Sequence, residues 1–254
     1  IGPAIFLLFY LLPPRPFFFL MVIATAAAAR EVVVMAGLPR PWFLLVLAVL
    51  PFVPLYFNST DGFLGAMVFS PVIAVAGILA SERGTDGSVN QTILLSVAAV
   101  LLCQLCLAAP FFCLYRLREI AHPWPVVLLL SIWASDTAAY GFGKTMGRHP
   151  LVPRVSPKKT YEGLLGAVVG SSAVVALTRG FTGLGIWEAV GLGAFLGVLG
   201  QLGDIFESAA KRAFGVKDSS GLIPGHGGVL DRVDSFIFSA PFVYAYYIIS
   251  VPSP

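Results

Sequence analysis

The densest run of charge and glycine in this 254-residue chain lies between Ser208 and Ser235. It reads SAAKRAFGVKDSSGLIPGHGGVLDRVDS and holds eight ionisable side chains, although only 11% of the chain is charged. Carboxylates can hold a divalent metal ion, cations neutralise phosphate oxygens, and glycines let backbone N–H groups approach an anion. The stretch therefore predicts phosphate chemistry. A solvated linker would need neither GHGG nor two carboxylates one helical turn apart.

A second polar block, SDTAAYGFGKTMGRHPLVPRVSPKKTYEG, runs from Ser135 to Gly163. Asp136, Tyr140 and Gly143 recur at helical spacing, so we expect them on one face. The loop that follows these residues sets five cations against one anion, Glu162, which suits a cytoplasmic loop, an anionic headgroup or a triphosphate. A plain positive-inside loop would explain this charge but not the glycine spacing. The cations are Lys144, Arg148, Arg154, Lys158 and Lys159.

Together the two blocks resemble the phosphatidate cytidylyltransferases, also called CDP-diacylglycerol synthases. The resemblance rests on an upstream DTxAY…GK…SPKKTxEG pattern and on a downstream signature, and it covers roughly residues 133–235. The signature reads here as Ser208-x-x-Lys211-Arg212, Lys217-Asp218, Pro224-Gly225-His226-Gly227-Gly228 and Asp231-Arg232-x-Asp234.

This resemblance implies an enzyme of phospholipid biosynthesis that converts CTP and phosphatidic acid to CDP-diacylglycerol and pyrophosphate. Its partners would be CTP, phosphatidic acid and the lipid bilayer, with no nucleic acid, and a homodimer is left open. Related CTP-using lipid enzymes, a CDP-archaeol synthase or a polyprenol kinase, are the nearest alternatives. A transporter fits less well because nearly all charges lie at the ends of apolar segments and in loops.

The family resemblance also suggests roles for individual residues. Asp204 and Asp231 are the expected primary ligands of Mg²⁺, with Asp234 and Asp218 as further candidates and a second cation left open. The expected catalytic set is Asp204, Asp231, Lys211, Arg212 and His226, where His226 either donates to a phosphate or leaving-group oxygen or makes only a loop hydrogen bond. The expected substrate-binding residues are Ser156, Lys158, Lys159, Thr160, Ser208, Lys217, Gly227, Gly228, Arg232, Asp136 and Lys144.

Apolar segments must position these residues. The chain is 57% hydrophobic with a mean hydropathy of +0.88, which predicts an all-α, polytopic membrane protein. We expect about nine spans, near 1–12, 16–36, 41–57, 63–80, 91–115, 124–143, 163–179, 185–206 and 235–251.

Two of these spans separate the two charged blocks, so both blocks should face one compartment, the cytoplasm of a bacterial inner membrane. The expected organisation is a scaffold over 1–123 and a catalytic region over 124–254. At the end of the span 185–206, Asp204, Ser208 and Lys211 share one helical stripe.

Arg30 and Glu31 interrupt an apolar segment of the scaffold. They either lie near the headgroups or pair inside the helix bundle. A charge at the bilayer centre costs at least ~2.5 kcal/mol on insertion scales, which favours the headgroup position.

Overall fold

The structure is a computed structural model that describes residues 2–38, 41–81, 88–220 and 227–250. These residues are almost entirely helical, so the prediction of an all-α membrane protein is confirmed. Six of the described helices are long and apolar enough to cross a membrane: Pro14–Met35, Thr60–Ala80, Thr92–Ile120, Pro123–Met146, Ile186–Ala213 and Leu230–Ser250.

The other three predicted spans correspond to shorter apolar helices, Gly2–Leu11, Pro41–Tyr56 and Tyr161–Leu177. At about 1.5 Å per residue, a straight crossing of the hydrocarbon core needs about 20 residues. The protein is thus an integral membrane protein, and the number of nine crossings stays a prediction.

The chain divides into two compact units. Unit 1 comprises Ile1–Phe17, Cys113–Ala213 and Val233–Pro254, and unit 2 comprises Phe18–Phe112 and Phe214–Arg232. The predicted division into a scaffold over 1–123 and a catalytic region over 124–254 is a functional one and stays a prediction.

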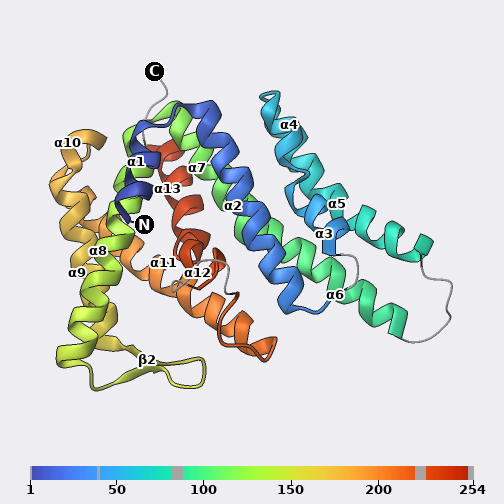
Figure 1. The fold of residues 1–254 in the computed structure, drawn as a ribbon. Helices are drawn as coiled ribbons and strands as arrows, with labels where there is room; N and C mark the ends of the chain where they lie inside the picture. The colour runs from blue at the N-terminus through green and yellow to red at the C-terminus, as the bar shows by residue number, and fades with distance from the viewer. Residues whose placement is uncertain (1, 39–40, 82–87, 221–226, 251–254) are drawn as a thin grey trace. The chain divides into compact units, whose positions relative to one another are not determined.

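Unit 1 is built around α8, which packs against α9 and α11 (Figure 1). Helix α11 also packs against α13, and α1 packs against α8. The helices and strands that lie in this unit are α1 (Gly2–Leu11), α8 (Pro123–Met146), β1 (Pro150–Val152), β2 (Ser156–Thr160), α9 (Tyr161–Leu177), α10 (Arg179–Thr182), α11 (Ile186–Ala213) and α13 (Phe236–Ser250).

Glycines bring α8, α9 and α11 unusually close together. A Cβ added at Gly166 of α9 would lie 2.6 Å from the Ala138 carbonyl oxygen of α8. A Cβ at Gly197 of α11 would lie 2.7 Å from the Ala167 carbonyl oxygen of α9. Small residues allow such backbone contact between helices in lipid, where van der Waals packing takes over from the hydrophobic effect. The three helices therefore form one tightly packed block.

A β-hairpin connects α8 to α9, where the sequence predicted only a loop. Strands β1 and β2 pair antiparallel, with Pro150 opposite Thr160 and Val152 opposite Ser156. The Thr160 side chain then caps α9 by accepting a hydrogen bond of 3.0 Å from the Gly163 N–H. The hairpin thereby fixes Lys158 and Lys159 beside the first turn of a helix.

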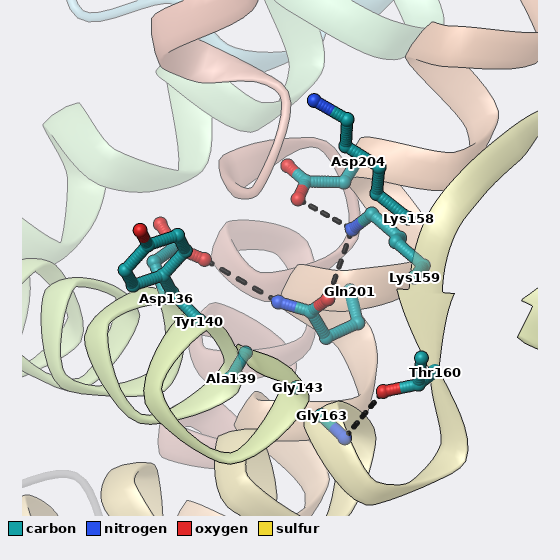
Figure 2. A pocket seen from close by; sticks show the side chains of 10 residues that line it. All are labelled: Asp136, Ala139, Tyr140, Gly143, Lys158, Lys159, Thr160, Gly163, Gln201 and Asp204. Carbon is teal, nitrogen blue, oxygen red and sulfur yellow. Dashed lines mark hydrogen bonds and ion pairs between the residues drawn. The ribbon is translucent and has the colours of Figure 1, made fainter. Parts of the chain in front are cut away.

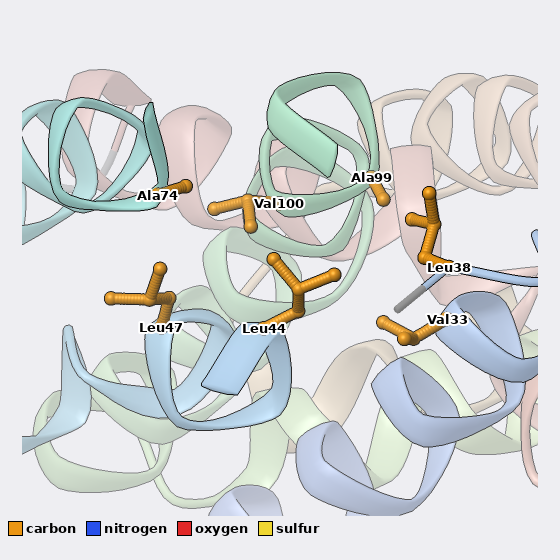
Figure 3. Packing of buried hydrophobic residues seen from close by; sticks show 7 residues of the cluster. All are labelled: Val33, Leu38, Leu44, Leu47, Ala74, Ala99 and Val100. Carbon is orange, nitrogen blue, oxygen red and sulfur yellow. The ribbon is translucent and has the colours of Figure 1, made fainter. Parts of the chain in front are cut away.

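Unit 2 is a helical assembly in which α5 packs against α6, α4 and α3. A buried apolar cluster joins α2, α3, α5 and α6, and its members are Val33, Leu38, Leu44, Leu47, Ala74, Ala99 and Val100 (Figure 3). The elements that lie wholly or mostly in this unit are α2 (Pro14–Met35), α3 (Pro41–Val49), α4 (Phe52–Tyr56), α5 (Thr60–Ser81), α6 (Ser88–Cys103), the π-helix η1 (Gln104–Ala108) and α12 (Leu230–Val233). Helix α7 (Ala109–Ile120) begins here and continues in unit 1.

Candidate active site

A cavity of about 210 Å³ opens in unit 1 between α8, β2, α9 and α11. Its lining combines acidic, basic and amide side chains with two glycines (Figure 2). The predicted stripe on α8 lies on its wall, as do three residues of β2. The lining residues are Asp136, Ala139, Tyr140, Gly143, Lys158, Lys159, Thr160, Gly163, Gln201 and Asp204.

Lys159 is the centre of a polar chain that crosses this cavity (Figure 2). Its Nζ donates to Asp204 Oδ2 at 2.5 Å and to Gln201 Oε1 at 2.9 Å. Gln201 Nε2 in turn donates to Asp136 Oδ1 at 3.4 Å. Residues from α8, β2 and α11 are thus linked through one ammonium group. The Lys159 and Asp204 side chains are only 17% and 25% exposed, so water screens their attraction less than it would at the surface.

A second carboxyl group lies beside Asp204. The Asp204 and Asp234 side chains are within hydrogen-bonding distance of each other. Ser235 donates from Oγ to Asp204 at 3.3 Å and from its backbone N–H to Asp234 at 2.7 Å. Two carboxyl groups this close need a proton or a cation between them. The donor set therefore fits a divalent cation, which prefers carboxylate oxygens.

The junction between the hairpin and α9 is held by Glu162. Its carboxylate accepts a 2.6 Å hydrogen bond from His149 Nδ1 and also accepts from the Arg148 and His149 backbone N–H groups. The His149 hydrogen bond, followed by the backbone N–H contacts, lowers the pKa of Glu162 to about 2. Glu162 therefore stays a charged acceptor at any physiological pH.

Six predicted residues of unit 1, among them Asp234, do not appear among the described residues that line the cavity. Lys144 donates to the Tyr140 hydroxyl at 3.3 Å, and Lys211 forms an ion pair of 2.8 Å with the buried Glu207. Ser156 begins β2, and α11 carries Ser208 and Arg212.

Asp231 lies in unit 2, in a set of contacts that we call the Glu31 cluster: Glu31, Ser219, Ser220, Gly228, Val229, Leu230 and Asp231. Asp231 Oδ2 accepts from Ser219 Oγ at 3.0 Å and from the Gly228 N–H at 2.9 Å. Glu31 is 1% exposed, whereas Arg30 is exposed, and the predicted headgroup position of the two residues stays a prediction. Hydrogen bonds to the Glu31 carboxylate offset the free-energy cost of burying its charge, and the insertion scale for a lone charge does not include them.

The remaining predicted residues are also in unit 2. Lys217, Asp218 and Arg232 are exposed, and Gly227 adopts a positive φ of 78°. His226 lies outside the described residues. Within the described parts of the chain, no three His, Cys, Asp or Glu side chains come together closely enough to hold a metal ion on their own.

With the geometry in hand, comparison with known proteins decides the family. A model described as the cytidylyltransferase family matches residues 1–250, almost the whole chain. The chain belongs to the cytidylyltransferase family. The resemblance on residues 133–235 is thus confirmed and extends through the scaffold helices as well.

Three relatives in the cytidylyltransferase family carry the name phosphatidate cytidylyltransferase. The one from Staphylococcus haemolyticus is 37% identical over 188 residues, which cover 73% of this chain and 72% of the relative. The one from Staphylococcus saprophyticus is 38% identical over 174 residues, covering 68% and 66%. The one from Staphylococcus aureus (strain COL) is 43% identical over 135 residues, so this chain matches about half of its length.

Sequence reasoning did not predict the polar contacts of two residues in this chain, Gln201 and Glu31. Gln201 lies three positions before Asp204 and therefore on the same face of α11, a signal that helical spacing could have supplied. Glu31 stood out as an acidic residue in an apolar helix, but its partners lie 188 to 199 positions away in the chain.

Proposed function

We propose that the cavity in unit 1 is part of the site where a cytidylyl group passes from CTP to phosphatidic acid, giving CDP-diacylglycerol and pyrophosphate. The observation that carries the proposal is the Lys159–Asp204 pair, with Gln201, in a chain of this family. The names of the relatives supply the two substrates.

The reaction requires little proton chemistry from the protein. An oxygen of the lipid phosphate attacks the α-phosphorus of CTP, a new P–O bond forms, and the bond to the bridging oxygen of pyrophosphate breaks with its electrons on the leaving group. The barrier is mainly charge crowding, so positioning and electrostatic stabilisation must lower it. Lys159 provides a partly shielded cation for this purpose, and Gln201 and Asp204 fix its position.

Mg²⁺ is the proposed cofactor. Asp204 and Asp234 would hold it, because their paired carboxyl groups fit a divalent cation, and Asp231 and Asp218 remain candidate metal ligands. When bound, Mg²⁺ supplies neutralisation of phosphate charge.

The other predicted residues keep their roles as part of this proposal. Lys158 and Thr160 are placed to contact a phosphate because they line the cavity. Lys211 would have to exchange Glu207 for a substrate oxygen. The expected phosphate contacts of Ser156, Ser208, Arg212, Lys217 and Arg232, and the role of His226, rest on the resemblance.

We further propose that the cavity faces the cytoplasm of a bacterial inner membrane. The cations of the block 135–163 favour the inner side, and the relatives are bacterial. A homodimer, left open by the sequence, would be tested by the mass of the purified protein in detergent.

The first test is pyrophosphate release by the full chain in detergent with phosphatidic acid, CTP and Mg²⁺. We expect turnover to need all three, and Asp204→Asn to lower kcat by at least about a hundredfold, as removal of a key electrostatic group commonly does. Asp231→Asn tests the second predicted ligand in the same assay. Glu188→Gln, on the first turn of the same helix as Asp204, is the matched control and should keep normal activity.

Each other outcome has a definite meaning. Activity with a different lipid acceptor but not with phosphatidic acid would assign the chain to a related CTP-using reaction. Near-normal activity of Asp204→Asn would remove Asp204 from the site. Inactivity of the well-folded wild-type chain with every acceptor would contradict the proposed function.

A further inference from the structure

Glu31 is an acidic residue of the N-terminal half that makes its contacts with the signature stretch of unit 2. It lies four residues before the end of α2, and its side chain is buried. The residues that surround its carboxylate come from 219–230, a stretch to which the sequence assigns phosphate chemistry.

Four donors converge on this one carboxylate. Oε1 accepts from Ser220 Oγ at 2.6 Å and from the Val229 N–H at 2.9 Å. Oε2 accepts from Ser219 Oγ at 3.0 Å and from the Leu230 N–H at 2.9 Å. An ionised carboxylate offers about four acceptor positions and no donor, so this side chain matches its surroundings completely. The amide of a glutamine at this position would place an NH₂ group, which is itself a donor, against some of these donors.

Glu31 is connected to Asp231 through two shared contacts. Ser219 Oγ is 3.0 Å from both carboxylates, yet a hydroxyl has one proton and can donate to only one of them at a time. Gly228 donates its N–H to Asp231, and a Cβ at Gly228 would collide with Ser219 Oγ and Glu31 Oε2. The position of Asp231 therefore depends on how Glu31 engages its donors.

The backbone that carries Glu31 is itself fixed. Two residues later, Val33 is 1% exposed and belongs to the apolar cluster of unit 2 (Figure 3). Ala28 and Ala29 are also fully buried. A well-packed helix thus presents one charged group to Ser219, Ser220, Val229 and Leu230.

We propose that Glu31 is a positioning residue for the cytidylyl transfer: it brings together two segments of the signature stretch, Ser219–Ser220 and Gly228–Leu230, and so holds Asp231 in place. This inference rests on the proposed function. Glu31 itself touches no reacting group. It supports a predicted ligand, as outer-shell hydrogen-bond partners do at metal sites.

The test compares Glu31→Gln with Thr25→Val in the full chain in detergent. Thr25 is a buried residue of the same helix whose hydroxyl bonds to the Met21 carbonyl of α2, so its replacement leaves the cluster intact. We expect Glu31→Gln to lower kcat about 10-fold to 100-fold and to raise the Mg²⁺ concentration for half-maximal activity, the range found for outer-shell partners. Thr25→Val should match wild type in both.

Hydrogen–deuterium exchange without Mg²⁺ gives an independent readout. In Glu31→Gln, the peptide covering residues 227–233 should exchange faster than in wild type, because the NH₂ group that replaces one carboxylate oxygen cannot accept from the Val229 or the Leu230 amide. Ser219→Ala is the fallback if Glu31→Gln does not fold, and it should show the same changes on a smaller scale.

A purely structural role would lower the melting temperature but leave kcat and the Mg²⁺ dependence of the folded protein at wild-type values, and that result would overturn the proposal. If the wild-type chain released no pyrophosphate, the proposed function would fail instead. The exchange experiment would then still decide whether Glu31 orders this stretch.

Discussion

Asp204 in unit 1 and Glu31 in unit 2 are both acidic residues on long apolar helices, but their partners differ in kind. Asp204 faces a lysine ammonium, a neighbouring carboxyl group and a cavity. Glu31 faces two serine hydroxyls and two backbone N–H groups and is buried. Under the proposed function, the contacts of Asp204 would be exchanged for a substrate or metal contact. Those of Glu31 belong to the backbone arrangement itself.

Under the proposed function, this difference separates a residue that would meet the substrate from a residue that orders its own segment of the chain. Where an acid is met by a mobile cation, binding of a charged ligand can rearrange the contacts at modest cost. Where an acid is met by fixed dipoles, its removal leaves several buried donors unsatisfied. Mutations that line the cavity of unit 1 should therefore change the kinetic parameters for the substrates. Mutations in the Glu31 cluster should change both the order of the backbone and the activity.

The largest effect that would sharpen this contrast is expected from two adjacent lysines. Lys159→Ala should lower kcat/KM about tenfold to a hundredfold, the value of charge-assisted hydrogen bonds, mainly by raising KM for CTP. Lys158→Ala, which removes an exposed cation from the same strand, should cost no more than about fivefold. Steady-state kinetics of both variants provide the measurement. Equal losses of kcat/KM in the two variants would mean that activity depends on the net charge of the hairpin and not on the contact between Lys159 and Asp204.

An intermediate effect is expected in the Glu31 cluster. Gly228→Ala places a methyl group against Ser219 and Glu31, and overpacking of this kind costs roughly 1–3 kcal/mol. We expect a lower melting temperature and about tenfold lower activity together, unlike the lysine variants, which should melt normally. Gly65→Ala in α5 meets nothing within 4 Å and is the control. A Gly228→Ala protein with wild-type melting and turnover would contradict the rigid arrangement described for this cluster.

The smallest effect concerns Glu162 and its dependence on pH. Its pKa is lowered from 4.5 to about 2, so its stabilisation of the hairpin is complete above pH 4.5 and is lost as the pH falls toward 2. The rate at which pepsin cuts the wild-type hairpin should rise from pH 4 to pH 2 by more than the pH dependence of pepsin activity itself explains. Glu162→Gln should be cut readily at both values and should change kcat/KM at pH 7 by less than about fivefold. Equal protection of both proteins at pH 4 would remove Glu162 from this role.

The sequence predicted much of the cavity in unit 1 because its residues lie in short motifs. Asp136 and Tyr140 share a helical face, and Lys158 to Thr160 form one strand, so spacing alone groups them. The ion pair of Lys211 with Glu207 follows the i, i+4 rule but competes with the predicted phosphate contact. Local patterns identify candidates and do not reveal which of them are already engaged.

What the sequence could not supply is the pairing of distant segments. Nothing near Glu31 indicates that residues around 219 and 229 will meet it, because that contact depends on how α2 packs in unit 2. An insertion cost computed for a lone charge also assumes that no donors are present. The hairpin was also not predicted, since its two strands are short and each contains a proline.

The glycine-mediated contacts among α8, α9 and α11 have a consequence for how the cavity in unit 1 can adapt to a substrate. Because these helices are in backbone contact, the three helical walls of the cavity form one closely packed block. The fourth wall is β2, a five-residue strand attached to a single short partner. Any adjustment of the cavity to a substrate would then fall to this hairpin and its side chains more than to the three helices.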